Sequence, residues 1–68
     1  MAGTYKKIEI VGTSTVGFAE AVKSAVQQAS KSVRHMEWFE VAEMRGRIKG
    51  TEVGEFQVTL RIGFKLED

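Results

Sequence analysis

The sequence contains no cysteine, no proline and a single histidine among its 68 residues. Disulfides are therefore excluded, and one histidine without cysteine partners is poor support for a metal site. A chain this short buries only about 60% of the surface that its unfolded form exposes, so small domains depend on disulfides, metals or self-association for stability. Because the first two routes are closed, we expect this chain to assemble with copies of itself.

A long apolar run, a basic block and a low-complexity tract are also missing. The apolar runs are far shorter than a membrane span and residues 1–7 lack the pattern of a secretion signal, so we expect a cytoplasmic protein without membrane contacts. Ten lysines and arginines are interleaved with nine aspartates and glutamates, which does not favour a nucleic-acid partner. Since no shift in composition marks a boundary, residues 1–68 are expected to form one domain.

The patterns of apolar residues predict a strand, a helix and two further strands. Residues 5–11 are β-forming and end at a glycine, which predicts the first strand. Apolar residues recur at steps of three and four between residues 18 and 33, which predicts an amphipathic helix of about five turns beginning near residue 15. Residues 36–48 and 53–66 predict two strands joined by a hairpin turn. The expected fold class is α+β, in the order βαββ.

The last strand alternates strictly between apolar and polar residues, and its apolar face should cover the helix. A turn centred on residues 50 and 51 predicts four cross-strand pairs: Phe39 with Ile62, Val41 with Leu60, Glu40 with Arg61, and Trp38 with Gly63. The same register places Trp38 outside the core of its own subunit, on a polar face with Glu40, Ala42, Met44, Gln57 and Arg61. An exposed indole indicates either a subunit contact or a platform on which a flat ligand stacks.

Two polar residues are candidate ligand contacts, each with a plainer interpretation. Gln57 offers an acceptor and a donor to the edge of a heterocycle, although a single glutamine on a strand is more often only solvated. It lies six residues from Gly63, about 20 Å along a strand, so Gln57 and Trp38 would share a small ligand only across two subunits. Arg45 adjoins Gly46, where we expect a bulge, and suits a phosphate. A solvated charge at the strand edge is the alternative.

Support for catalysis is weak. The run from Gly12 to Gly17 has the glycine spacing of a phosphate-binding loop, but Phe18 and Ala19 replace the lysine and hydroxyl residue that this chemistry needs. No motif places the histidine beside a serine, and the glutamates of residues 37–43 alternate between the two faces of a strand. We therefore expect a binding protein without catalytic residues or metal ligands.

Segments spread over the whole chain resemble the bacterial dodecins: residues 8–14 (IEIVGTS), 38–41 (WFEV), 45–46 (RG), 56–58 (FQV) and 63–68 (GFKLED). The resemblance implies a βαββ protomer whose three-stranded antiparallel sheet wraps around the helix, and a hollow homododecamer of such protomers. It also implies that flavin pairs stack between Trp38 side chains of related subunits. By the same resemblance, Gln57 contacts the ring edge and Arg45 contacts the phosphate of flavin mononucleotide (FMN).

The function implied by the resemblance is storage, buffering and photoprotective quenching of flavins, with no catalysis. Arg45 favours FMN, while flavin adenine dinucleotide (FAD) and riboflavin are further candidates, and some members of the family also bind coenzyme A. Two alternatives stay open. One is an interaction module in which Trp38 is only a subunit-interface anchor. The other is a flavin-dependent oxidoreductase, which would need an open substrate face beside the flavin.

Overall fold

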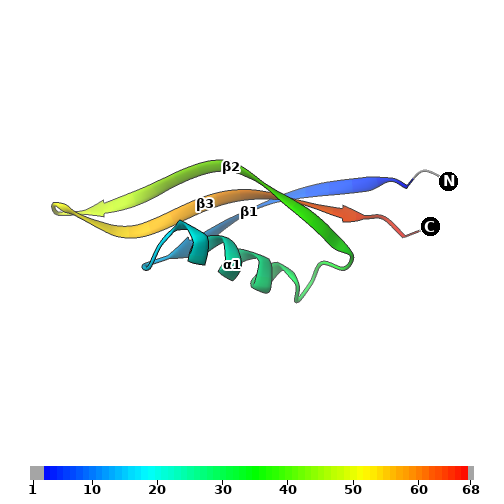
Figure 1. Ribbon diagram of the computed structural model, residues 1–68, viewed down its shortest axis with the longest axis horizontal. Coiled ribbons are helices and arrows are strands. Elements are labelled where there is room, and N and C mark those ends of the chain that lie inside the picture. Colours follow the sequence, from blue (N-terminus) through cyan, green and yellow to red (C-terminus); the bar gives the residue numbers. More distant parts are fainter. Residues whose placement is uncertain (1–2, 68) are drawn as a thin grey trace.

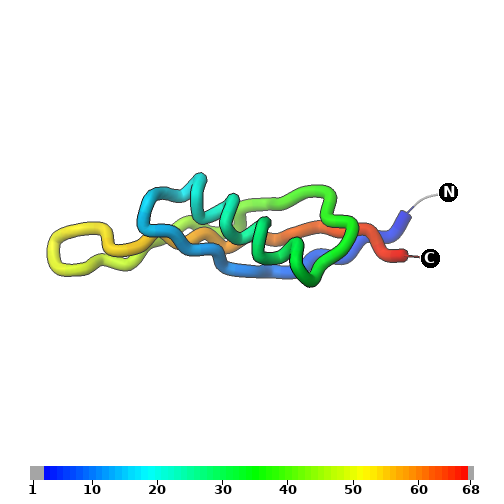
Figure 2. The backbone as a smooth tube through the Cα atoms, turned by 90° about the horizontal axis from the view of Figure 1, so that it is seen from below, coloured from blue at the N-terminus to red at the C-terminus, as the bar shows by residue number. Residues whose placement is uncertain are grey.

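The computed structural model describes residues 3–67 and has the predicted βαββ order. Its elements are β1 (Tyr5–Ser14), α1 (Phe18–Ala29), β2 (Met36–Lys49) and β3 (Glu52–Lys65). The three strands form one antiparallel sheet in the order β1-β3-β2. Figures 1 and 2 show α1 on one face of this sheet and the β2–β3 hairpin projecting past it. The expected α+β fold with a three-stranded antiparallel sheet is confirmed.

The chain is elongated and exposes much of its surface. Its radius of gyration is 14.1 Å and its principal extents are 53 × 20 × 14 Å, whereas a compact domain of this length has a radius of gyration of about 11 Å. Its accessible surface of 5122 Å² compares with roughly 4300 Å² for a compact monomer of this size. This excess agrees with the expectation that the chain needs further copies of itself for stability.

The core lies between α1 and the middle strand β3. Its fully or nearly fully buried apolar side chains are Ala21, Ala25, Ala29, Val58, Leu60 and Ile62. Since alanines form the buried side of α1, the helix backbone lies close to the sheet. No helix in the described residues is long and apolar enough to cross a membrane.

The close approach of α1 explains why β1 passes through Gly12 instead of ending there. A Cβ added at Gly12 would overlap the carbonyl oxygen of Ala21 and lie 2.6 Å from Cβ of Ala25. Gly12 itself keeps a ladder position opposite Val58. The prediction that β1 ends before Gly12 is therefore wrong, because this glycine serves helix packing and not chain reversal.

The helix is shorter than predicted, with 12 residues and not the expected five turns. Before it, Oγ of Ser14 accepts a hydrogen bond from the Val16 amide at 2.9 Å, which forms a local turn outside the helix. After it, Oγ of Ser30 donates to the carbonyl oxygen of Gln27 at 2.6 Å. His35 then takes a φ of 63°, a conformation that turns the chain into β2.

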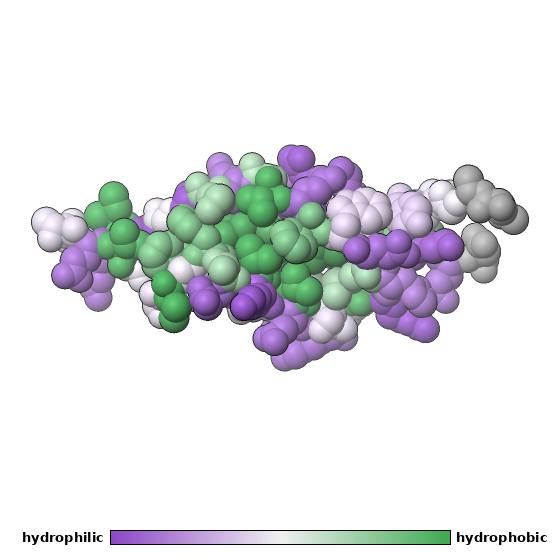
Figure 3. Space-filling view, viewed as in Figure 1, coloured by the Kyte–Doolittle hydropathy of each residue, from purple (hydrophilic) through white to green (hydrophobic). Residues whose placement is uncertain are grey.

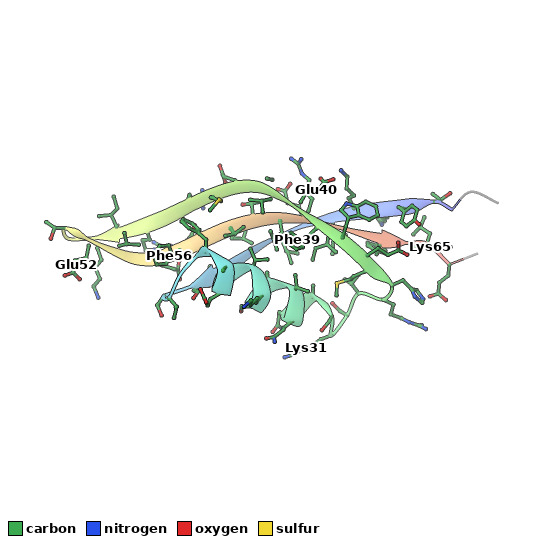
Figure 4. The ribbon with its side chains drawn as sticks, viewed as in Figure 1. Lys31, Phe39, Glu40, Glu52, Phe56 and Lys65 are labelled. Atoms are coloured by element: carbon green, nitrogen blue, oxygen red, sulfur yellow. The ribbon has the colours of Figure 1, made fainter. Side chains whose placement is uncertain are left out.

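The predicted register of the β2–β3 hairpin is confirmed at all four predicted pairs. Trp38, Phe39, Glu40 and Val41 lie opposite the four predicted partners of β3. Figure 4 shows that Phe39 points toward α1, whereas Glu40 points away from it. The hairpin turns at Gly50, where φ is 66°.

Beyond Val41 the register shifts, and Ala42 is an extra residue in β2. Because one extra residue exchanges the two faces of a strand, Met44 pairs with Val58 on the helix side. The prediction that Ala42 and Met44 lie on the same face of β2 as Trp38, in a regular register, is thus wrong. The bulge expected at Gly46 is wrong as well, since Gly46 has a regular partner and the next shift follows it, between residues 47 and 48.

Candidate functional site

Trp38 lies across β3 at the position of Gly63. A Cβ added at Gly63 would lie 2.6 Å from Cη2 of the indole and would overlap its Cε2 and Cζ2. The ring of Tyr5 packs beside the indole, with ring centroids 5.2 Å apart and planes inclined by 57°. Trp38 is nevertheless 38% exposed. The indole is thus fixed by the β3 backbone and by Tyr5 while keeping surface that a flat ligand or another subunit could cover.

Two ion pairs lie on the face of the sheet that carries Trp38. Nζ of Lys7 is 3.0 Å from Oε1 of Glu40, and Nε of Arg61 is 3.2 Å from Oε1 of Glu9. The hydrogen bond from Lys7 is the main cause of a lowered pKa of Glu40, and the Trp38 indole also lowers this pKa. Glu40 is therefore ionised at neutral pH and is a weak base there.

Four side chains form a second group on this face, nearer the hairpin turn: Arg45, Arg47, Glu55 and Gln57, here called the polar cluster. Nε of Arg45 donates to Oε1 of Gln57 at 2.7 Å. Nε2 of Gln57 donates to Oε1 of Glu55 at 2.8 Å, and Nε of Arg47 lies 3.8 Å from the same oxygen. Gln57 is only 8% exposed. Its amide is therefore held between a cation and an anion.

A shallow cavity of about 270 Å³ opens at the polar cluster and is lined by Arg45, Gly46, Arg47 and Gln57. Arg45 reaches Gln57 only because the extra residue Ala42 shifts the register of β2. Sequence patterns missed this contact and missed Glu55 altogether, since nothing in the alternation of residues marks the position of the bulge. The structure thus brings two of the three predicted site residues together.

Trp38, the third predicted site residue, is remote from the polar cluster. Gly63, beneath the indole, and Gln57 are six residues apart on β3, which corresponds to about 20 Å. Both groups lie on the same face of the sheet because an even number of residues separates them. One small ligand cannot contact both groups within a single chain.

An apolar hollow of about 180 Å³ lies between α1 and β2, on the opposite side of the sheet from the polar cluster. Its lining residues are Val26, Met36, Glu37, Trp38, Phe39 and Ile62. Phe39 is 49% exposed there, and Figure 3 shows hydrophobic residues gathered across the middle of this view. Apolar surface of this kind is typical of contacts between subunits.

His35, the single histidine, lies at the end of the molecule remote from the hairpin turn. Its Nε2 is 3.7 Å from Oε1 of Glu67, and Nη1 of Arg34 is 3.8 Å from the same oxygen. Among residues 3–67, no three acidic or histidine side chains are grouped so that they could hold a metal ion.

Comparison with known proteins identifies similar chains over almost the full length. A family model named Dodecin matches residues 4–67. A dodecin of Thermus thermophilus is 48% identical over 68 residues, which is 100% of this chain and 99% of that protein. The solved dodecin of Streptomyces coelicolor has a TM-score of 0.94 and 45% identity, over 97% of this chain and 94% of that one. For the dodecin of Streptomyces davaonensis the TM-score is 0.95 and the identity 35%, over 100% of both chains.

Proposed function

The chain belongs to the dodecin family of flavin-binding proteins, and on this premise we propose that it stores flavins and quenches their excited states, with FMN as the preferred ligand. The observation that carries the proposal is the single indole, Trp38, which rests on Gly63 and is 38% exposed. An indole in this position offers a flat surface to an isoalloxazine ring. Stacking of a flat heterocycle on an aromatic side chain contributes about 1–3 kcal/mol.

The polar cluster supplies the contacts that stacking lacks. After its two hydrogen bonds, the Gln57 amide still has one N–H donor and one acceptor lone pair, which suit the polar edge of the flavin ring. Arg45 uses Nε for Gln57 and keeps its two terminal nitrogens for a phosphate. A phosphate contact favours FMN over riboflavin. FAD, whose diphosphate is also anionic, and coenzyme A are further candidate ligands.

Both groups of residues serve one flavin only if they come from different subunits, because about 20 Å of strand separates them within a chain. We therefore propose a hollow homododecamer in which flavin pairs stack between Trp38 side chains of related subunits. The elongated shape and the exposed Phe39 and Val41 support this assembly, since they leave apolar surface for neighbouring copies.

Quenching follows from the redox chemistry of stacked rings. A photoexcited flavin stacked on Trp38 would supply the electron acceptor, and the indole would donate one electron and receive it back, so that no net reaction would occur. Glu40 lies near enough to the indole for the two groups to interact, and its pKa is lowered. The negative charge of ionised Glu40 would stabilise the transient positive charge on the oxidised indole until the electron returns.

A second candidate function is an interaction module in which Trp38 is only a subunit anchor. This alternative is favoured by the apolar hollow between α1 and β2, beside the exposed Phe39 that follows Trp38 in β2, because another copy would cover this surface. It predicts assembly without flavin binding.

A fluorescence titration of FMN with the assembled protein, combined with light scattering for particle mass, distinguishes the two functions. Storage and quenching predict a twelve-subunit particle in which flavin emission is lost at a ratio near one FMN per chain. Trp38→Ala should weaken binding and restore emission while the particle mass is unchanged. A twelve-subunit particle that leaves FMN fluorescent would support the interaction module and refute the proposed function.

A further inference from the structure

The orientation of the Gln57 amide is determined by two charged neighbours. A glutamine amide has a donor end and an acceptor end of nearly equal shape, so its partners decide which end faces which way. The Arg45 side chain can only donate and the ionised Glu55 carboxylate can only accept. Oε1 of Gln57 must therefore face Arg45 at 2.7 Å, and Nε2 must face Glu55 at 2.8 Å.

The backbone reinforces this arrangement. Arg45 lies opposite Gln57 and Arg47 lies opposite Glu55, with the pair of Gly46 and Phe56 between them, so the four side chains are neighbours on one face of the hairpin. Between the arginines, a Cβ added at Gly46 would lie 2.8 Å from the carbonyl oxygen of Glu55. Glycine at this position thus allows β2 to lie close to β3. Because Gln57 is 8% exposed, its amide has little access to water while Arg45 and Glu55 are in place.

Glu55 also sets the charge of the polar cluster. The cluster contains two arginines and one carboxylate, and Nε of Arg47 lies 3.8 Å from that carboxylate. The side chain of Glu55 is 31% exposed, so its charge acts in a partly desolvated place. A phosphate bound at Arg45 would be repelled by Glu55, whereas an uncharged flavin would feel no such repulsion.

We propose that Glu55 is a positioning and specificity-determining residue of the flavin site. It holds the Gln57 amide with its acceptor end toward Arg45, and its charge limits the preference for phosphorylated over unphosphorylated flavins. This inference rests on the proposed function. Glu55 contacts Gln57 and acts on the ligand through that amide and through its own charge.

Two substitutions separate the two roles. In Glu55→Gln the new amide oxygen still accepts from Gln57 while the charge is lost; Glu55→Ala removes both. Removing the negative charge of Glu55 beside a phosphate bound at Arg45 should tighten FMN binding about three- to tenfold at low salt, and the gain should vanish at high salt. Loss of the hydrogen bond should weaken riboflavin binding about fivefold. Glu43→Gln is the control, since Glu43 contacts Thr59 and not the cluster.

The experiment measures riboflavin and FMN affinities of the assembled parent and variants, with the side-chain amide resonances of Gln57 recorded by NMR without ligand. We expect the ratio of FMN to riboflavin affinity to rise in both Glu55 variants and not in Glu43→Gln. Riboflavin affinity should fall, and the Gln57 amide resonances should shift toward those of a solvated amide, only in Glu55→Ala. An unchanged affinity ratio in both variants, or equal riboflavin losses in both, would overturn the inference. A parent that shows the ordered amide but binds neither flavin would instead refute the proposed function.

Discussion

Gly63 controls the position of the Trp38 indole, and Gly63→Ala therefore tests the stacking surface without removing the tryptophan. A methyl group at this position would lie 2.6 Å from Cη2 and still closer to Cε2 and Cζ2. Contacts between carbon atoms are favourable only at about 3.5–4.0 Å. The indole must therefore leave the β3 backbone and give up its present contact with Tyr5.

The size of the effect follows from what the displaced indole no longer provides. Stacking on an aromatic side chain is worth about 1–3 kcal/mol, and a displaced ring keeps part of this. We expect Gly63→Ala to weaken FMN binding about tenfold, corresponding to about 1.4 kcal/mol. The global fold should persist, since Gly63 lies beneath a partly exposed side chain and not under the helix.

Tryptophan fluorescence gives a direct assay because Trp38 is the only tryptophan in the chain. The emission of Gly63→Ala should move to longer wavelength, and its FMN titration should need about ten times more ligand for equal quenching. Gly54→Ala is a matched control in the same strand, where the nearest atom to an added Cβ is Cβ of Lys49 at 3.1 Å. If the indole emission shifted while FMN bound as in the parent, Trp38 would not be the stacking platform.

Two further predictions concern stability, measured as unfolding midpoints at a fixed chain concentration. Gly12→Ala should destabilise the protein by about 1–3 kcal/mol, because the new methyl group overlaps the Ala21 carbonyl oxygen; an unchanged midpoint would refute the close packing of α1 on β1. The lowered pKa of Glu40, due mainly to Lys7, should add stability above pH 4.5 that is lost as pH falls through the folded pKa. The unfolding midpoint of Lys7→Gln should therefore differ from that of the parent at pH 6 and approach it at low pH. A difference in midpoint that stays constant with pH would contradict this explanation.

Periodicity in the sequence was sufficient for the element order and for the first part of the hairpin. Strict alternation in β3 and a two-residue turn at Gly50 determine which residues face one another, so the pair of Trp38 with Gly63 is predicted correctly. Element ends were harder to predict, because a glycine can stop a strand or admit a helix. Only the packing of α1 shows that Gly12 allows the helix to lie close to β1 and does not end the strand.

The polar cluster depends on one residue that alternation cannot identify. In an unbroken register, Met44 would face Gln57 and Arg45 would lie on the helix side of β2. The extra residue Ala42 exchanges these positions, so Arg45 instead donates to Gln57 at 2.7 Å. Deleting Ala42 would therefore return the arginine to the apolar face, where a charge is costly. The bulge thus links the two halves of the proposed site, since β2 carries Trp38, the proposed stacking surface, before it and Arg45, the proposed phosphate contact, after it.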